Sequence, residues 1–580
     1  MSTSGFQKIK EPESDIPGSL PSFWGASRRE RILVTLIVVA VSVLLYFGWR
    51  MMWFLTDDAF IAFRYVSNSL LGHGYVWNAP PFRPVEGYTS FLWVALLDIV
   101  WRLFDVEPPR SANIMSLLCA LGSLMVVSMA VLRMKLTAGL SRFRLWFLTL
   151  ILIGIVTNRT FLTWSSSGLE TALFNLTLLS WVVVTLFGAP DRHHRLFFMT
   201  TTAALVYLSR PDGILVVLST CLLLLFSLPR VIRKGRFDFR WLLSITSLLI
   251  VPIHLAWRRL TYGEWLPNSY FAKHVAAWPE SGVRYLASFV LEQGLWVYLL
   301  VLVTVGYLRL KRPSDRRQDH GSISRPSVEA RIVIATLLLH LAYYTFIIGG
   351  DHFEYRVYSY LVPLIFLSLL SSVNSGGFRR MTAVACFVLV ILVSFPIAWT
   401  HWSLTREFDS RRQAHIMTVP VHPSFPTGLQ WYAKPFDHLQ AWLIERHVCM
   451  RRQEHKLFYE YQTRRYPSRD AGEKVHPGEY PVMALTMVGV AGWVFPHVNI
   501  IDEYGLNDYV IARHPPVDRP HRLMAHDRQA PPGYVEAFEP NLIVAADEQI
   551  ARYPRRSELT AQKIRDTERY YWELVNRDRE

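Results

Sequence analysis

Two adjacent carboxylates, Asp57 and Asp58, follow an apolar run that begins at Ile32. A helix over residues 32–55 is long enough to cross a bilayer, so both acids would lie where it reaches the membrane surface. A carboxylate in that position can act as a general base or as a nucleophile. An acid at a helix end can also simply stay hydrated. The two neighbouring acids are therefore the first candidates for chemistry.

The segment behind this pair is amphipathic and rich in aromatic residues. Arg64, His73, Arg83 and Glu86 follow closely along the chain. Four large aromatic residues are interleaved with these polar groups, namely Tyr75, Trp77, Tyr88 and Trp93. Aromatic rings stack on sugar faces, but they also anchor proteins at headgroup depth, so none of the four is informative alone.

The composition predicts a polytopic membrane protein. The chain has 580 residues, of which 51% are hydrophobic and 18% charged, and the apolar residues occur in long blocks. The formal net charge of +15 does not indicate nucleic-acid binding, because the Lys and Arg residues gather in short loops between the apolar blocks. The four cysteines show neither a disulfide framework nor metal-binding spacing.

Eleven apolar blocks are predicted to span the membrane. They cover residues 32–55, 111–132, 145–160, 169–187, 196–209, 213–228, 241–258, 288–308, 330–348, 357–373 and 381–399. Segment 86–105 is ambiguous, because Asp98 and Arg102 interrupt its apolar residues. If this segment is re-entrant or lies along the interface, the three long basic loops fall on the cytoplasmic side together with the basic residues 28–31. These loops cover residues 133–144, 229–240 and 309–331.

This topology divides the chain into three parts and leaves the remaining polar connections outside. Residues 1–27 are expected to form a disordered cytoplasmic tail, and residues 28–399 a transmembrane domain with a large first outer loop at 56–110. Residues 400–580 are polar and Pro-rich, and they are long enough for an extracytoplasmic α/β domain. Within that part, the hydrophobic pattern of residues 481–508 predicts strand, helix, strand.

An ordered series of motifs resembles a known family. The motifs are TDDAFIAFRY (56–65), GHGYVWN (72–78), VEGYTSFLW (85–93), SSSGLET (165–171), SRPDG (209–213), YGEWLPNSYFAK (262–273), GGDHFEYR (349–356), NIIDEYGLND (499–508) and RPHRLMAHDRQAPPGYVE (519–536). The series is similar to bacterial GT-C arabinofuranosyltransferases, which use polyprenyl-phosphoryl-arabinose, and to their relatives. The resemblance implies a GT-C fold whose first outer loop carries the acidic residues of the active site.

The resemblance also implies that one acid of the paired motif is the catalytic carboxylate, and by position this is Asp57 or Asp58. Sugar transfer passes through an oxocarbenium-like state, so such a carboxylate can serve as a base or, with retention of configuration, as a nucleophile. The departing phosphate needs cationic partners. Lys273 and Arg356 are the first candidates for that role, although both residue types also snorkel to lipid headgroups at helix ends.

Other candidates are weaker. Arg210 and Arg64 are further candidates for the phosphate, although Arg210 and Asp212 can also pair only with each other. Further donor-site candidates are acids and a histidine at the outer ends of predicted spans or in the first outer loop: Glu86, Glu170, Asp351 and His352. Candidates for the acceptor lie in the outer region: Asp502, Glu503, Asp508 and His526. No cofactor requirement is visible, and the use of a divalent cation is left open.

The motifs therefore favour an enzyme of the bacterial inner membrane, with a cytoplasmic N-terminus and its site on the periplasmic face. It would transfer a sugar, D-arabinofuranose being the first choice, from a polyprenyl-phosphate-linked donor to a glycan or protein acceptor. Transfer of mannose, rhamnose or aminoarabinose is an alternative, as are a flippase for lipid-linked sugars and a structural membrane protein. A flippase would favour repeated halves and charges at mid-membrane, neither of which is visible.

Overall fold

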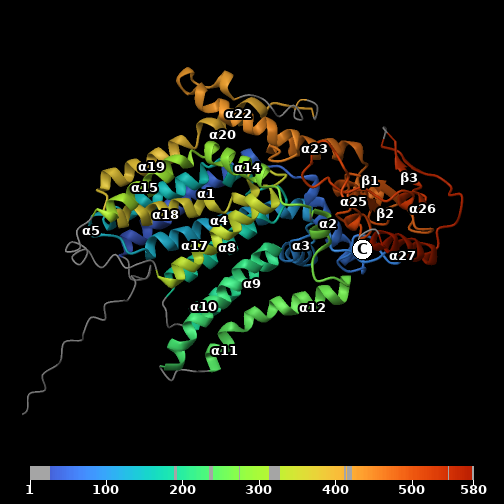
Figure 1. The fold of residues 1–580 in the computed structure, drawn as a ribbon, viewed down its shortest axis with the longest axis horizontal. Coiled ribbons are helices and arrows are strands. Elements are labelled where there is room, and N and C mark those ends of the chain that lie inside the picture. The colour runs from blue at the N-terminus through green and yellow to red at the C-terminus, as the bar shows by residue number, and fades with distance from the viewer. Residues whose placement is uncertain are drawn as a thin grey trace, which may run out of the picture.

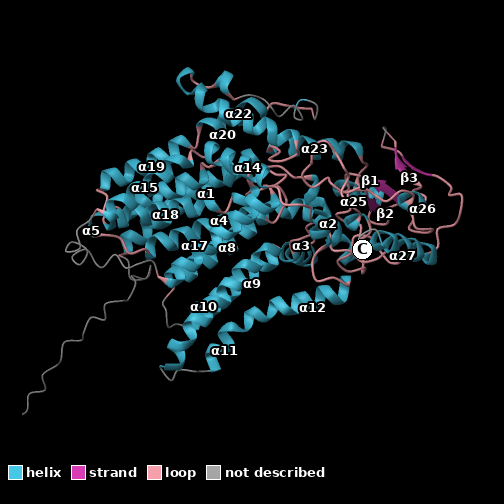
Figure 2. Cartoon of the chain, viewed as in Figure 1, coloured by secondary structure: helices cyan, strands magenta, loops and turns pink. Residues whose placement is uncertain are grey.

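The computed structural model describes residues 27–188, 193–233, 239–273, 275–311, 327–410, 413, 421–545 and 548–577. A body of long helices forms one end of the molecule (Figure 1). A smaller part that mixes short helices, loops and strands forms the other end (Figure 2).

The long helices of the body coincide in large part with the eleven predicted apolar blocks. These helices are α1 (Arg28–Met52), α4 (Pro108–Arg133), α6 (Arg144–Val156), α8 (Thr171–Phe187), α9 (His193–Ser209), α10 (Ile214–Arg233), α12 (Ile250–Tyr262), α15 (Leu295–Leu310), α17 (Val328–Ala342), α18 (Leu361–Gly376) and α19 (Arg380–Val393). Shorter helices connect or extend them: α5 (Ala138–Ser141), α7 (Arg159–Thr163), α11 (Phe239–Ile245), α13 (Asn268–Lys273), α14 (Pro279–Glu292) and α20 (Pro396–Thr405).

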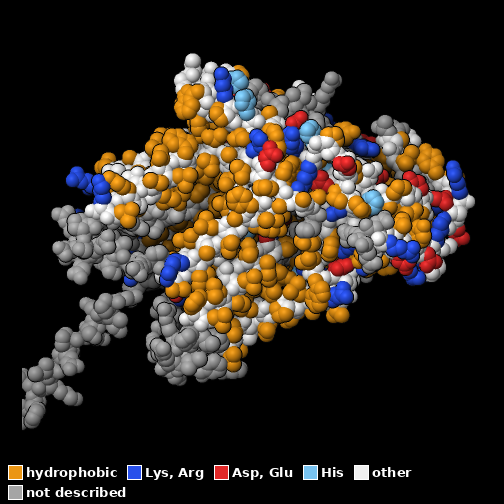
Figure 3. All heavy atoms as spheres, viewed as in Figure 1, with side chains coloured by type: hydrophobic (Ala, Val, Ile, Leu, Met, Phe, Trp, Pro, Cys, Tyr) orange, Lys and Arg blue, Asp and Glu red, His pale blue; other side chains and the backbone are white. Residues whose placement is uncertain are grey.

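Five helical stretches of the described chain are long and apolar enough to cross a bilayer: Arg28–Met52, Pro108–Arg133, Val328–Ile348, Arg356–Gly376 and Arg380–Thr405. A sixth arises if α14 and the following helix, which meet at an angle of 86°, form one broken span. Hydrophobic side chains cover most of the helical body, whereas charged side chains are most frequent over the other end (Figure 3). The prediction of a multi-pass membrane protein is confirmed, and the number eleven stays a prediction.

The body has an apolar core of its own. Leu45 of α1, Leu152 of α6, Phe366 of α18 and Phe387 of α19 belong to one buried cluster and are at most 4% exposed. The cluster therefore joins helices that are more than 300 positions apart in sequence, and it fixes the end of α1 from which the paired acids emerge.

The other end contains the predicted strand, helix and strand. Strand β1 (Val482–Leu485) pairs in parallel with β2 (Asn499–Asp502), and α25 (Gly489–Val494) connects them. Strands β3 (Leu542–Val544) and β4 (Ile550–Arg552) form a separate antiparallel pair. The remaining helices of this region are α22 (Gln430–Glu445), α23 (Arg452–Arg465), α24 (Arg469–Gly472), α26 (Tyr534–Ala537) and α27 (Ala561–Arg577).

This outer region shares its core with the first outer loop. Helix α2 (Asp57–Leu70) contributes Phe63, which packs edge-on against Trp493 of α25 with ring centroids 6.2 Å apart. Trp77 donates from its indole nitrogen to the carbonyl of Ile500 at 2.8 Å. The outer region thus closes around α2 (Figure 1). The domain boundary at residue 400 stays a prediction.

Helix α3 (Phe91–Phe104) occupies the ambiguous segment. Its 14 residues reach about 21 Å, which is less than the roughly 30 Å of a hydrocarbon core. Asp98 faces inward, where it accepts hydrogen bonds from Tyr75 and Arg102 at 2.9 and 3.0 Å. These observations fit an interfacial helix, which stays a prediction. The predicted tail lies outside the described residues except for Ser27, and the basic loops 229–240 and 309–331 lie partly outside them.

Candidate active site

The two acids at the start of α2 have different surroundings. Asp57 is 6% exposed, and its carboxylate accepts hydrogen bonds from the backbone N–H groups of Gly489 and Val490 at 3.1 and 2.8 Å. A Cβ at Gly489 would lie 1.9 Å from the Asp57 carbonyl oxygen, so this close approach requires glycine. Burial raises the pKa of Asp57 to about 7. Asp57 therefore fastens the outer region to α2.

Asp58 is exposed and remains available. Within the described part of the chain its carboxylate has neither a hydrogen bond nor an ion pair. Its negative charge nevertheless acts on several groups from distant segments, since it contributes to the pKa values of Lys273, His352, His526 and Asp502. Asp58 is thus the carboxylate around which these segments converge.

Lys273 lies at the end of α13, close enough to Asp58 for that charge to act on its pKa. Helix α13 is anchored at its other end, because Asn268 donates from Nδ2 to the carbonyls of Gly505 and Leu506 at 2.9 and 3.0 Å. Lys273 is exposed, and no described residue forms a hydrogen bond or ion pair with its ammonium group. The surrounding protein lowers the pKa of Lys273, while the charge of Asp58 raises it. An unpaired cation and an unpaired carboxylate therefore share this face.

Arg356 is held by the acid that lies five residues before it. Its Nε and Nη2 donate to the two carboxylate oxygens of Asp351 at 2.8 and 3.2 Å, which is a bidentate pair. The guanidinium also lies over the ring of Phe353, with Cζ 4.4 Å from the centroid. This geometry fixes the orientation of Arg356 and leaves part of it, 14% of the side-chain surface, exposed.

Arg210 extends the positive charge on the same side. It lies 3.3 Å from Asp212 and 3.7 Å from Glu170, and it donates to the hydroxyl of Tyr344. The hydroxyl of Tyr344 in turn donates to Asp212 at 2.8 Å. Arg210 and Asp212 do pair, as one interpretation of the sequence proposed, but Arg210 also reaches Glu170. The charges of Glu170 and Asp351 both act on Arg210, so Arg210 and Arg356 are neighbours.

A cluster of histidines also lies within reach of the charge of Asp58. The ring of His352 lies 5.2 Å from that of His455 and 5.6 Å from that of His526, and His447 completes the cluster. His352 and His526 are each held through Nδ1 by a backbone carbonyl at 2.8 Å. Burial lowers the pKa of His526 to about 4, so it is neutral near pH 7. Among the described residues no group of three or more His, Cys, Asp or Glu side chains has the geometry of a metal site.

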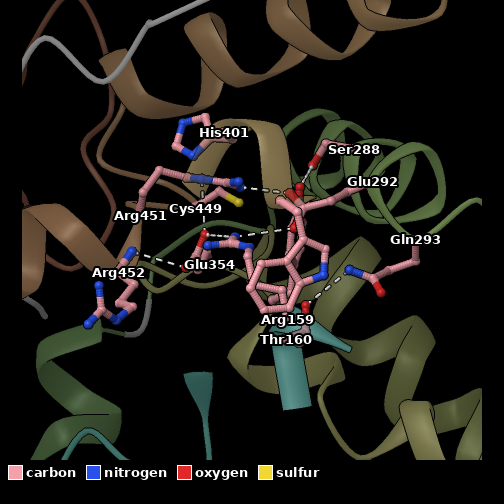
Figure 4. Close-up of polar contacts among 12 residues, drawn as sticks. Arg159, Thr160, Ser288, Glu292, Gln293, Glu354, His401, Cys449, Arg451 and Arg452 are labelled. Atoms are coloured by element: carbon pink, nitrogen blue, oxygen red, sulfur yellow. Dashed lines mark hydrogen bonds and ion pairs between the residues drawn. The ribbon is translucent and has the colours of Figure 1, made fainter. Parts of the chain in front are cut away.

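A buried ion network lies beneath the loop that carries Asp351 and Arg356 (Figure 4). Glu354 pairs with Arg159 at 2.6 Å and with Arg451 at 3.0 Å, and Glu292 pairs with the same two arginines at 3.2 and 2.9 Å. All four side chains are at most 3% exposed. Two positive and two negative charges thus balance inside the protein, and the backbone of the loop is fixed between the body and the outer region.

Several candidates have structural partners instead of facing Asp58. Arg64 is 1% exposed, and five hydrogen bonds account for its five N–H donors. Glu86 forms a buried pair with Arg258 at 2.5 Å. Asp502 and Asp508 are both enclosed, and each accepts hydrogen bonds from the backbone that follows it.

Some residues of this arrangement were not singled out from the sequence. Glu354 lies within the motif GGDHFEYR, but nothing in its spacing indicates that it is buried between two arginines. Arg451 and His455 lie in the polar stretch RRQEH, which reads as a solvated helix start. One signal was available for Glu292, because it is an acid near the edge of an apolar block of the sequence.

Comparisons with known proteins show which proteins the chain resembles. The terminal beta-(1->2)-arabinofuranosyltransferase of Mycobacterium tuberculosis is 30% identical over 361 residues, which are 58% of this chain and 55% of that protein. The enzyme of the same name from Corynebacterium glutamicum is 25% identical over 395 residues, which are 63% of this chain and 54% of that protein. The chain is a homologue of arabinofuranosyltransferases. It spans about half the length of these relatives.

The resemblance inferred from the motifs is thereby confirmed, whereas no family model matches the chain. The crystal structure of ArnT from Cupriavidus metallidurans bound to undecaprenyl phosphate has a similar fold, with a TM-score of 0.50 and 9% identity over 83% of this chain and 88% of that one. At this identity the likeness concerns the fold alone. It confirms the expected GT-C type of fold.

Proposed function

We propose that this protein is a membrane glycosyltransferase that transfers D-arabinofuranose from a polyprenyl-phosphate-linked donor to an acceptor on the extracytoplasmic face. The observation that carries the proposal is the meeting of unpaired Asp58 and unpaired Lys273, beside Arg356 and Arg210, in a homologue of arabinofuranosyltransferases. A carboxylate next to a group of cations suits a reaction in which a sugar leaves a phosphate.

In the reaction, an acceptor hydroxyl oxygen forms a bond to the anomeric carbon while the bond from that carbon to the phosphate oxygen breaks. Both electrons of the broken bond stay with the polyprenyl phosphate. Asp58 takes the hydroxyl proton if the configuration inverts. If the configuration is retained, Asp58 attacks the anomeric carbon first and the polyprenyl phosphate leaves; the acceptor hydroxyl then displaces the carboxylate of Asp58 and gives its proton to the departed phosphate. Either course needs an ionised carboxylate that is open to the substrate.

Exposure favours Asp58 over Asp57 for this role. Both carboxylate oxygens of Asp57 already accept backbone hydrogen bonds, and its pKa of about 7 leaves it partly protonated at neutral pH. A group that is buried, bonded and partly neutral is a poor base. We assign Asp57 to positioning α25 and Asp58 to the chemistry.

The phosphate would bind to Lys273 and Arg356. No described acid forms an ion pair with Lys273, so its charge is available to a ligand. Arg356 is oriented by Asp351, so the charge is pre-positioned before the leaving group develops its own. Arg210 adds positive charge behind them, and Glu170 orients it. A lipid-linked donor can reach this group from within the bilayer, next to the ends of the spanning helices.

The topology that accompanies this function has eleven spans, a cytoplasmic N-terminus and an extracytoplasmic region 400–580 in the inner membrane of a bacterium. The convergence of the loops at residues 57–58, 210, 273 and 351–356 supports this arrangement, because all four would lie on one side of the membrane. Reporter fusions after residues 110 and 410 should behave as extracytoplasmic, and a fusion after residue 136 should behave as cytoplasmic.

Purified protein in nanodiscs, supplied with synthetic polyprenyl-phosphoryl-arabinose and an arabinofuranosyl acceptor, tests the reaction directly. Wild-type protein should form the glycosidic product, and Asp58→Asn should lower the rate by about 10²–10⁴-fold while its unfolding temperature stays close to that of the wild type. Asp57→Asn should instead lower the unfolding temperature.

Three results would contradict parts of this proposal. Equal loss of activity in both variants without any loss of stability would contradict the division of roles. Translocation of the labelled lipid across the bilayer without any transfer would instead indicate a flippase. Product formation with polyprenyl-phosphoryl-mannose but not with the arabinose donor would correct the sugar and keep the mechanism.

A further inference from the structure

Arg528 binds the end of the short helix that carries Lys273. It is 5% exposed, and it donates from Nε to the carbonyl of Ala272 at 3.3 Å and from Nη2 to the carbonyl of Phe271 at 3.1 Å. Its Nη1 donates to the carbonyl of His514. One buried guanidinium thus joins the last turn of α13 to a part of the outer region that lies 256 positions later in the sequence.

Helix α13 needs such a donor because it is short. It has six residues, whereas helices shorter than about 12–15 residues are marginal in water. The last carbonyl groups of a helix have no partner within the helix, and an arginine side chain can bind them. The carbonyls of Phe271 and Ala272 are two of these groups. Lys273 is the final residue of α13, so Arg528 fixes the backbone from which the ammonium group extends.

A second arginine of the same segment binds the chain beyond Lys273. Arg522 donates from Nη1 to the carbonyl of Ala276 at 2.6 Å, and its Cζ lies 4.7 Å from the ring centroid of Trp278. Segment 522–528 therefore holds the backbone both before and after Lys273, while Lys273 itself stays exposed.

The same segment is connected to the loop that carries Arg356. The N–H of Met524 donates to the carbonyl of Arg446 at 3.0 Å, and the residue three positions after Arg446 donates its N–H to the carbonyl of Asp351 at 2.9 Å. Asp351 in turn forms the bidentate pair with Arg356. Short contacts thus connect the backbone around Lys273 with that of Arg356, so the segment helps to set the distance between the two cations.

The middle of the segment lies close to the proposed catalytic carboxylate. The charges of Asp58 and Lys273 both contribute to the pKa of His526. The ring of His526 lies 5.6 Å from that of His352, next to Asp351. The segment that holds α13 therefore belongs to the surroundings of the site, and a displacement of it would move Lys273 relative to Asp58.

We propose that Arg528, supported by Arg522, is a positioning residue of the transfer reaction, which holds α13 so that the ammonium group of Lys273 and the guanidinium of Arg356 meet the donor phosphate together. The proposal rests on the proposed function, from which it takes the role of Lys273. The three nitrogen atoms of Arg528 each donate to a backbone carbonyl, so Arg528 acts through Lys273 and not by contact with the substrate. A cation held in place before the leaving group becomes charged lowers the barrier.

Binding of the leaving group is measured first, without any transfer. Calorimetry on the full chain in nanodiscs follows the binding of farnesyl phosphate, a short polyprenyl phosphate. Arg528→Gln and Lys273→Ala should each raise its Kd by roughly fivefold or more. Arg528→Lys keeps the charge but not the planar fork of donors, so its Kd should lie between those of the wild type and Arg528→Gln.

Arg555→Gln is the matched control. Arg555 is half-buried in the same outer region, and it too donates to three backbone carbonyls, which belong to Glu479, Tyr480 and Glu539. None of these residues belongs to α13 or to segment 522–528. The control variant should change the Kd by less than about twofold.

Transfer kinetics then distinguish positioning from a merely structural role. Arg528→Gln should lower kcat by roughly 10–100-fold and leave the KM of the acceptor within about twofold. In protein that already carries Lys273→Ala, the same substitution should lower kcat further by less than about threefold, because the group that Arg528 positions is gone. A structural role would instead multiply the two losses.

The outcomes separate this proposal from the proposed function. Unchanged Kd and kcat in Lys273→Ala would refute the role of Lys273 and this proposal with it. Losses in Lys273→Ala but not in Arg528→Gln, or losses that multiply in the double variant, would overturn this proposal alone. Should Arg528→Gln fail to fold, Arg522→Gln decides by the same two measurements, since it releases the chain on the other side of Lys273. Unchanged values in folded Arg522→Gln protein would then overturn the proposal.

Discussion

Replacing Glu354 by Gln tests whether the buried ion network holds the loop that carries Asp351 and Arg356. The carboxylate lies 2.6 Å from Arg159 and 3.0 Å from Arg451, and it also accepts the N–H of Arg452 at 3.0 Å. Coulomb's law at an effective dielectric constant of about 20 gives roughly 5 kcal/mol for each ion contact at such distances. Part of this is offset, because a neutral Gln no longer suffers the desolvation of a charge.

We therefore expect Glu354→Gln to lower the free energy of unfolding by about 3–5 kcal/mol, since it leaves one uncompensated positive charge in the interior. Thermal and denaturant unfolding in detergent, followed by near-ultraviolet circular dichroism, measures this. Glu407→Gln is the control, because Glu407 is 79% exposed in its pair with Arg406 and should contribute less than about 1 kcal/mol.

The double variant Glu354→Gln/Arg159→Met tests whether charge imbalance causes the loss of stability in Glu354→Gln. It leaves Arg451 and Glu292 as a neutral pair at 2.9 Å. Its loss of unfolding free energy should therefore be smaller, by about 1–3 kcal/mol, than the sum of the losses in the two single variants. Strict additivity would refute charge balance as the reason for the stability. A stable Glu354→Gln variant would refute the role of the network altogether.

Four variants and one additive extend the test to the site. Arg64→Ala should lower the free energy of unfolding by about 3–5 kcal/mol. It should also make region 400–580 susceptible to trypsin, because three backbone carbonyls of that region lose their hydrogen-bond donor. Lys273→Ala should lower kcat by about 10²–10³-fold, with partial recovery in Lys273→Arg. Because the pKa of Asp57 rises from its ordinary 3.8 to about 7, folded protein binds a proton that unfolded protein has released. The free energy of unfolding should therefore decrease as the pH rises from about 4 to about 7. Asp57→Asn should make that decrease smaller. In the proposed mechanism the cations of the chain bind the phosphate, so EDTA should leave most of the transfer rate.

The sequence predicted the helical body because apolar blocks are a local property. Most blocks coincide in large part with one helix, whereas block 241–258 is divided between α11 and α12. The strand, helix and strand over 481–508 follow from local periodicity as well. The meeting of Asp58, Lys273 and Arg356 was also predictable in outline, because charge placement put their loops on one side of the membrane. The order of the motifs along the chain and the predicted side of each loop together indicate these few loops.

Partners that lie far apart in sequence could not be predicted in this way. Asp57 and Asp58 are neighbours of one type, and only the approach of Gly489 distinguishes them. Arg64 looked like a free cation, but three of the four backbone carbonyls that receive its N–H groups belong to residues after 490. Every residue has a backbone carbonyl, so a buried arginine that binds such carbonyls cannot be recognised from residue types.

The guanidinium of Arg64 has a consequence for how the protein is made. Three of the carbonyls that it binds belong to residues 428, 431 and 434 positions further along the chain. At roughly 5–20 residues per second, the ribosome needs about 20–90 s to produce them. During that interval α2 lacks the segment that covers it. A chaperone, the translocation machinery or the lipid surface must shelter its aromatic face until the closing segment arrives.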